Sequence, residues 1–226
     1  MKNIDTTLRR VAVWDLPIRL FHWALAALIA FSWWSAEEGH LDWHMRSGLA
    51  VLTLLIFRVL WGIFGSSTAR FANFVHGPRI LMAYLRDMRG WDPVGHSPLG
   101  ALSVLALLIA LKIQVMTGLV QTDDDGLVEG PLAHLVSFDT AEAAHDLHEI
   151  TFDLLVALIV LHVGAIVFYR IARGKKLVRP MITGSASFAA GTKPMRPGKW
   201  WVALLCLLGA LAMTRWVLAG APPFGP

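Results

Sequence analysis

The sequence predicts an all-α membrane protein in which four membrane-spanning helices form a core and a fifth follows at the C-terminal end. Three observations support this fold class: the composition, five long apolar runs, and the charges of the segments that connect the runs. Of the 226 residues, 56% are hydrophobic and 16% are charged, whereas a soluble domain carries about 25% charged residues. The composition therefore favours a helical bundle in a membrane over a soluble domain.

A helix needs about 20 mostly apolar residues to cross a bilayer, and five segments approach this length. They are Ile18–Trp34, Ser47–Phe64, Leu99–Val120, Ile150–Ile171 and Trp200–Val217. Pro17 and Pro98 precede the first and third segments, where a proline favours the start of a helix. Tryptophans lie near the ends of most segments, as in the interfacial aromatic belt of membrane proteins.

The charges of the connections predict how the helices are oriented. Lys and Arg predominate in the N-terminal arm and in the second and fourth connections: Lys2, Arg9, Arg10, Arg19, Arg70, Arg79, Arg86, Arg89, Arg170, Arg173, Lys175, Lys176, Arg179, Lys193, Arg196 and Lys199. Acids predominate in the first and third: Glu37, Glu38, Asp42, Asp123, Asp124, Asp125, Glu129, Asp139, Glu142, Asp146 and Glu149. The positive-inside rule then places the N-terminus in the cytoplasm and the C-terminus outside. The net charge of +4 reflects this topology, and nucleic acid is not expected as a partner.

Four of the nine histidines lie within or at the edge of a predicted span, where a costly polar side chain indicates a functional site. His22 is near the cytoplasmic end of the first span, and His44 is at the outer edge of the second. In the fourth span His148 is at the outer edge and His162 lies deeper. These two are 14 residues apart, close to four helical turns, so both face one side about 21 Å apart along the axis.

Each histidine of the fourth span has a partner at its own depth, His44 for His148 and His22 for His162. Two imidazoles on opposite faces of a haem iron leave no open coordination position, which favours electron transfer over oxygen binding. The sequence thus predicts two b-type haems. They are held without a covalent bond, because the single cysteine, Cys206, excludes a CxxCH attachment motif.

Several neighbouring residues leave alternatives open. His145 competes with His148 as a ligand and His40 with His44, whereas His76, His96 and His134 are expected at the surface or at headgroup level. Arg58 either snorkels to the inner headgroups or pairs with a haem carboxylate, and Arg19 and Arg170 have the same two interpretations. Lys112 is a haem-carboxylate partner, part of a proton route or a packing residue, and Gly48 and Gly118 leave room for a macrocycle.

The remaining segments complete the domain organisation. Residues 1–180 are expected to form the two-haem transmembrane domain. Residues 181–226 are expected to comprise a cytoplasmic linker, the fifth transmembrane helix and a short periplasmic tail. The connection from Ser66 to Asp92 is either an amphipathic segment on the inner leaflet or a cytoplasmic linker with some helix.

Four motifs occur in order along the chain: VWDLPIRLFHW at 13–23, FRVLWG at 57–62, GHSPLGA at 95–101, and HDLHE at 145–149 followed by LHV at 161–163. Together they resemble the bacterial cytochrome b561 family, over roughly residues 13–184. This family includes the cytochrome b subunits of nickel-iron hydrogenases and is similar to the membrane subunit of formate dehydrogenase. The fifth span is not part of the family's core pattern.

The resemblance implies a multi-pass protein of the bacterial inner membrane with two bis-histidine haems, the cytoplasmic one on His22 and His162 and the periplasmic one on His44 and His148. It further implies electron transfer between quinone, either ubiquinone or menaquinone, and a periplasmic carrier such as a c-type cytochrome or a hydrogenase. Ser97 departs from the family, which often has Asn there, near a quinone-binding position. The acidic run Asp123–Asp125 with Glu129 either steers a basic partner or is a solvated loop.

Two other functional hypotheses remain open at this point. One is a quinone-linked oxidoreductase that acts alone, for example on superoxide, although an acidic outer surface repels an anion. A second, remote one is a cofactor-free transporter or scaffold, which would leave His22 and His162 in hydrocarbon without a purpose. The oligomeric state is also open, with a homodimer among the options, and membrane lipid is the one partner that the composition itself requires.

Overall fold

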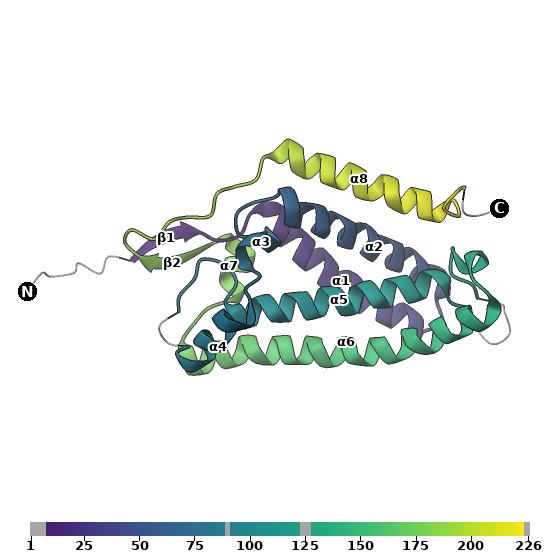
Figure 1. Cartoon of the computed structure of the whole chain (residues 1–226), viewed down its shortest axis with the longest axis horizontal. Coiled ribbons are helices and arrows are strands. Elements are labelled where there is room, and N and C mark those ends of the chain that lie inside the picture. Colours follow the sequence, from purple (N-terminus) through teal and green to yellow (C-terminus); the bar gives the residue numbers. More distant parts are fainter. Residues whose placement is uncertain (1–7, 89–90, 123–127, 224–226) are drawn as a thin grey trace, which may run out of the picture.

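Five helices of the computed structural model are long and apolar enough to cross a membrane, which confirms the predicted fold class. The structure describes residues 8–88, 91–122 and 128–223. Lys2, Arg89 and Asp123–Asp125, used above for the charge pattern, lie outside these ranges. The five long helices are α1 (Leu16–Glu37), α2 (Leu41–Phe64), α5 (Pro98–Val120), α6 (Phe138–Arg173) and α8 (Trp200–Leu218), and they run side by side (Figure 1).

Local capping explains where three of these helices begin. Asp15 accepts a hydrogen bond from the backbone N–H of Ile18, so α1 starts just after it and Pro17 lies in its first turn. Ser97 accepts from the N–H of Gly100 and caps α5 in the same way. Ser137 does so for α6. Such side chains satisfy N–H groups that have no partner inside the helix.

The fourth transmembrane helix is longer than the sequence predicted. It begins at Phe138 and not at Ile150, and spans 36 residues, which corresponds to about 54 Å against a hydrocarbon core of about 30 Å. The added turns carry Asp139, Glu142 and Asp146. Because these residues are charged, a hydropathy criterion does not assign the turns to a membrane span. Helix α6 therefore extends well beyond the apolar part of the bundle.

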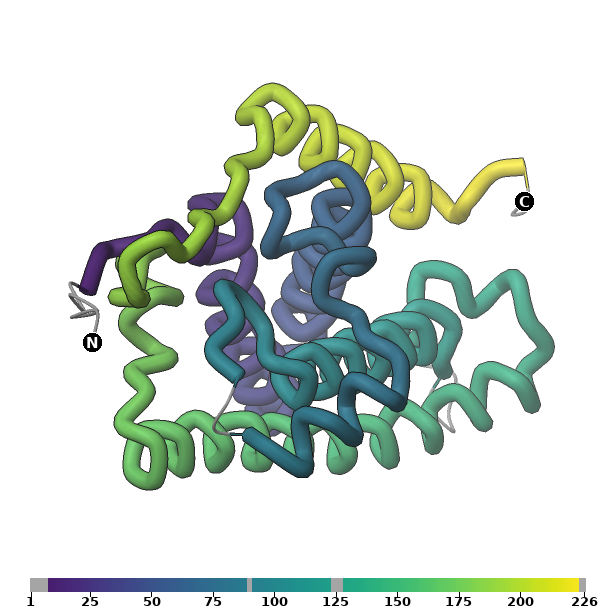
Figure 2. The backbone as a smooth tube through the Cα atoms, turned by 60° about the vertical axis from the view of Figure 1, so that its left-hand side comes forward, coloured from purple at the N-terminus to yellow at the C-terminus, as the bar shows by residue number. Residues whose placement is uncertain are grey.

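The first four long helices enclose a common core, and the fifth lies outside it. Helix α1 packs against α2, and α5 against α6, while α2 also contacts α5 and α8. The core draws apolar side chains from all four helices: Phe21, Leu25, Val51, Leu55, Leu111 and Leu155. Helix α8 rests on the outer side of α2 through its buried Cys206 and Ala210 (Figure 2). This arrangement matches the predicted four-helix core with an added helix.

A small antiparallel sheet, which the sequence did not predict, joins the two ends of the segment that resembles the cytochrome b561 family. Strand β1 (Leu8–Ala12) pairs with β2 (Ser185–Ala189), and in Figure 2 the chain that follows α6 rises to meet the N-terminal segment. The contact continues beyond the strands, because the N–H of Val13 donates to the carbonyl of Gly184. Both strands are five residues long, too short for alternation to be evident in the sequence.

Short helices fill the remaining connections. The segment between α2 and α5 forms α3 (Phe71–Phe74) and α4 (Pro78–Arg86), so this connection contains helix, as both of its interpretations allow. Tyr84 of α4 is buried, and its hydroxyl is 2.5 Å from that of Tyr169 on α6. A 3₁₀ turn (Ala133–Leu135) precedes α6, and α7 (Val178–Thr183) precedes β2.

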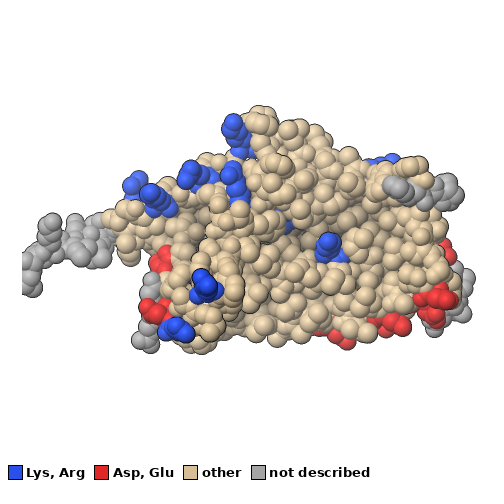
Figure 3. All heavy atoms as spheres, viewed as in Figure 1, with Lys and Arg blue, Asp and Glu red and all other residues tan. Residues whose placement is uncertain are grey.

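Charge is distributed unequally between the two ends of the bundle. Lys and Arg gather around the sheet, α7 and the start of α8, whereas most of the visible Asp and Glu lie at the opposite end (Figure 3). We refer to these as the basic end and the acidic end. The sides between them expose large apolar residues such as Ile109, Val160 and Leu161, as expected for a surface that faces lipid.

The buried pair of Trp61 and Asp15 leads to a prediction about stability. Trp61 is 1% exposed, and its indole N–H donates to Oδ2 of Asp15 at 3.0 Å. Trp61→Phe keeps an aromatic ring but removes the donor from a buried carboxylate, which costs about 1–3 kcal/mol. We expect a lower midpoint of thermal unfolding in detergent. Trp200→Phe, at a site 78% exposed, is the control, and equal midpoints for the two variants would contradict the prediction.

Candidate functional site

At the acidic end, the structure brings His44 of α2 and His148 of α6 close together, with their rings nearly perpendicular. Their ring centroids are 6.1 Å apart, with an angle of 80° between the ring planes. Two imidazoles that bind opposite sides of one metal ion through nitrogen–metal bonds of about 2 Å have centroids about 6 Å apart. The spacing therefore suits one iron between the two rings, with a porphyrin to supply its other ligands.

Hydrogen bonds from neighbouring helices fix both rings. Nδ1 of His44 lies 2.9 Å from the carbonyl oxygen of Ser32 on α1, and Nδ1 of His148 lies 3.1 Å from the hydroxyl of Thr117 on α5. A histidine that binds a metal commonly donates its other ring N–H to such an acceptor. Nε2 of each ring is then the nitrogen that remains for a metal.

Two glycines shape the space around this pair. A Cβ atom on Gly118 of α5 would lie 2.9 Å from Cε1 of His148, so the ring rests directly on the α5 backbone. A Cβ atom on Gly48, one turn after His44, would meet nothing within 4 Å, so the space beside His44 is open. The open space at Gly48 agrees with the predicted room for a macrocycle, whereas Gly118 makes room for the imidazole of His148.

At the basic end, His22 of α1 and His162 of α6 lie close enough to interact electrostatically. Nδ1 of His162 is 3.3 Å from the hydroxyl of Ser103 on α5. Nδ1 of His22 is buried and has no hydrogen-bond partner within the described ranges. An unpaired buried nitrogen costs about 1–3 kcal/mol, and His22 thus differs from the other three histidines, whose Nδ1 atoms each have a neighbour within hydrogen-bonding distance.

Arg58 is buried near the basic end and does not snorkel to the surface. Its side chain is 3% exposed, and Nη1 donates to the carbonyl of Ala69 at 3.2 Å. The guanidinium carbon lies 4.5 Å from the ring centroid of Phe71 and 5.9 Å from that of Phe74. The snorkelling interpretation is wrong, because α3 folds over the side chain and holds it inside the bundle.

The other predicted basic residues differ in their surroundings. Arg19 donates to the carbonyl of Ile182 on α7, while its Nε is buried without a partner among the residues described. Arg170 and Lys112 are exposed. Lys112 lies two positions from Gln114, about 160° around the helix. Since Gln114 bonds to Thr151 on α6, Lys112 faces away from the histidines, and its interpretation as a haem-carboxylate partner fails.

His96 was expected at the surface, and the structure places it inside the basic end. Its ring lies 4.6 Å from that of Trp14 and 4.4 Å from that of Phe74, and Nδ1 is buried without a partner in the described part of the chain. Burial lowers the pKa of His96 to about 3, with the charges of Arg58 and His162 acting in the same direction. Its position just before the start of α5 was the signal that sequence reasoning missed.

A pocket of about 280 Å³ adjoins His96 and is also lined by Thr68, Phe74, Val94 and Lys193. Ser97, next in the chain, uses its hydroxyl to cap α5. Since Asn is an equally good helix cap, the exchange of the family's Asn for Ser preserves this local structure.

A helical bundle that brings together histidines of different helices at its two ends has features of a membrane-bound cytochrome b. A family model described as prokaryotic cytochrome b561 matches residues 13–184. The chain belongs to this family, and α8 lies outside the matched residues. No curated protein and no solved structure matches the chain. Membership makes it a multi-pass membrane protein that binds b-type haem and transfers electrons.

The contact between Gly118 and His148 can be tested with a matched pair of variants. Gly118→Ala forces the imidazole away from α5, and overpacking of this kind costs about 1–3 kcal/mol. We expect a lower haem content per chain after purification. Gly164→Ala adds the same methyl group to α6, where nothing lies within 4 Å, and should retain the haem content of the wild type. Equal haem loss in both variants would rule out the contact as the cause.

The buried His96 predicts a dependence of stability on pH. Its pKa of about 3 in the folded chain lies below the unfolded value of about 6.5, so the unfolded state binds more protons between these values. Its contribution is therefore complete above pH 6.5 and is lost as the pH falls toward 3. In His96→Leu the thermal midpoint should fall less steeply over this range. His76→Leu, at an exposed histidine, should follow the wild type, and parallel curves for all three proteins would refute the prediction.

Proposed function

We propose that this chain conducts electrons across the bacterial inner membrane through two b-type haems, one held by His44 and His148 and the other by His22 and His162. The observation that carries the proposal is the spacing of 6.1 Å between the His44 and His148 rings, which suits two axial ligands of one iron. The second pair uses the same helix, because His162 lies 14 residues after His148 on α6, about 21 Å along its axis.

The surrounding residues fit the cofactor that the family implies. A bound haem supplies an iron that gains and loses one electron at a time. Ser32, Thr117 and Ser103 orient the imidazoles through Nδ1, which keeps Nε2 directed to the metal. Each histidine pair would hold the iron of such a haem through two protein nitrogens, which would leave no position for a small molecule and would favour electron transfer over chemistry on a substrate.

One buried and one half-buried arginine supply positive charge at the basic end. Arg58 is buried and donates to a backbone carbonyl. Arg19 is half-buried, and its Nε lies inside without an acceptor among the described residues. Arg19 and His22 are three positions apart, on neighbouring faces of α1. We assign both guanidinium groups to the carboxylates of the basic-end haem, because a buried cation is stabilised by an anion within reach.

The proposed electron route runs between the quinone pool and a carrier outside the cell membrane. The basic end would face the cytoplasm. The pocket beside His96 places the polar Thr68 and Lys193 beside the apolar Phe74 and Val94, a mixed lining that suits the carbonyls and the ring of a quinone headgroup. At the acidic end, Asp139, Glu142 and Asp146 are exposed on the protruding part of α6. Their charge suits a basic partner such as a c-type cytochrome and disfavours superoxide as a substrate.

Single replacements of the four histidines test the pairing. His44→Ala or His148→Ala should lower the haem content from two per chain to one, and His22→Ala or His162→Ala should remove the other haem. Haem per chain, measured by absorbance of the denatured cofactor, gives the count. His40→Ala and His145→Ala are the controls and should retain both haems. Loss of both haems from each variant, or of neither, would contradict the proposed pairs.

The same variants test the direction of the route. Chains of His148→Ala should still be reduced by added quinol, because the remaining haem lies at the basic end beside the proposed quinone pocket. Chains of His162→Ala should be reduced slowly or not at all. Equal rates of reduction for the two variants, measured by stopped-flow absorbance, would place the quinone elsewhere.

A further inference from the structure

A second pocket, of about 320 Å³, lies at the basic end between the last residue of α2 and the first turn of α8. Its apolar wall consists of Phe64, Trp201 and Val202, and its polar side consists of Arg70 and Lys199. In the described part of the chain, no acidic residue lines it. The pocket is lined by none of the residues assigned above to haem or quinone, and it exists only because α8 docks on α2.

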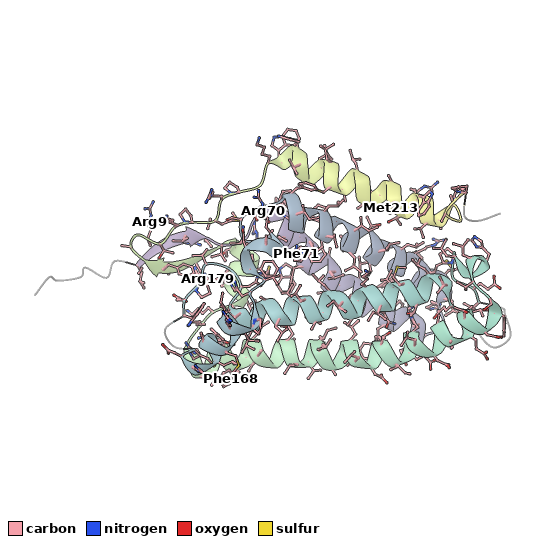
Figure 4. All side chains as sticks on the ribbon, viewed as in Figure 1. Arg9, Arg70, Phe71, Phe168, Arg179 and Met213 are labelled. Atoms are coloured by element: carbon pink, nitrogen blue, oxygen red, sulfur yellow. The ribbon has the colours of Figure 1, made fainter. Side chains whose placement is uncertain are left out.

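Contacts hold the two cations of this pocket in place. The Nε of Arg70 donates to the carbonyl of Gly65 at 2.8 Å, which anchors the guanidinium at the end of α2, below the start of α8 (Figure 4). Nζ of Lys199 lies 5.5 Å from the ring centroid of Trp201. Neither side chain forms a salt bridge within the ranges that the structure describes. Both positive charges therefore remain available to an anion.

The depth of the pocket matches that of lipid headgroups. Phe64 ends α2 and Trp200 begins α8, so the pocket lies at the boundary where apolar helices give way to a basic connection. One turn farther into the bundle, exposed apolar side chains continue on both helices: Ile63 and Val59 on α2, and Leu205 and Leu208 on α8. We call the line of contact between α2 and α8 the seam. A ligand with a phosphate at the pocket and long apolar chains along the seam would match both the cations and the apolar side chains.

We propose that an anionic phospholipid of the leaflet at the basic end binds between α2 and α8, with its phosphate at Arg70 and Lys199 and its acyl chains along the seam. Basic pockets between transmembrane helices are suited to such headgroups. A zwitterionic headgroup is disfavoured, because its own cation would lie beside two others. The site goes beyond the proposed electron route, and it stabilises the attachment of α8, the helix outside the family match.

The test uses purified full-length protein with its haem, stripped of lipid in a non-ionic detergent. Dioleoylphosphatidylglycerol or dioleoylphosphatidylcholine is added, and bound lipid per chain is counted by native mass spectrometry. We expect preferential binding of phosphatidylglycerol. Each cation is worth about fivefold in affinity, so Lys199→Gln should weaken binding of phosphatidylglycerol about fivefold and the double variant with Arg70→Gln about 25-fold, with phosphatidylcholine unaffected.

The matched control removes two cations of the basic end that lie outside the pocket, Arg9 on β1 and Arg179 on α7 (Figure 4). The variant Arg9→Gln with Arg179→Gln should bind phosphatidylglycerol as the wild type does, and equal weakening in both double variants would overturn the site in favour of general surface attraction. Unchanged haem absorbance shows that each variant is folded. If the variant with Arg70→Gln does not fold, Lys199→Gln alone provides the test, because its side chain is exposed.

A further arm distinguishes lipid from free phosphate. Glycerol 3-phosphate carries the same charged group without acyl chains. At the concentration at which phosphatidylglycerol saturates the protein, it should not raise the midpoint of thermal unfolding. Protection by glycerol 3-phosphate equal to that by phosphatidylglycerol would overturn the proposal, as would equal binding of the two phospholipids to the wild type.

Discussion

The cost of placing polar side chains in hydrocarbon constrains this whole structure. Three imidazoles inside the bundle have an acceptor for Nδ1, which Ser32, Thr117 and Ser103 provide from α1 and α5. The fourth, His22, has a buried Nδ1 without a partner in the described part of the chain. Gly118 lets the His148 ring lie directly on α5, and Gly48 leaves open space beside His44. The packing of the four-helix core thus holds three of these rings in fixed orientations, each with its Nε2 directed away from the acceptor.

Much of the fold was evident in the sequence, because a membrane imposes simple length and charge criteria. The five spans, the helix starts near Pro17 and Pro98, and the family followed from apolar run length and a few motifs. The pairing of His44 with His148 was predicted from their depth in the membrane alone, and the two rings lie close together in the structure. Two features could not be predicted from the sequence. The first turns of α6 were missed because they are acidic, and the two strands were missed because they are short.

The basic end was the hardest part to predict, since long-range packing decides it. Arg58 and His96 looked like interfacial residues, yet Phe74 of α3 contacts both and removes them from water. No local pattern announces that a four-residue helix will fold back over the end of α2. The orientation of Lys112, by contrast, follows from its angle around α5 relative to Gln114. It is known once the contact of Gln114 with Thr151 is known.

The short sheet bears on how the protein matures. Strand β2 is synthesised after α6, and its pairing with β1, together with the bond from Arg19 to Ile182, ties the start of α1 to the chain beyond α6. His22 and His162 come from these two helices, so the sheet ties together the ends of both. In the proposed assignment, a haem between them is enclosed by a contact that forms only after α6 has been synthesised, and separation of the two strands is expected to ease entry and release of the cofactor.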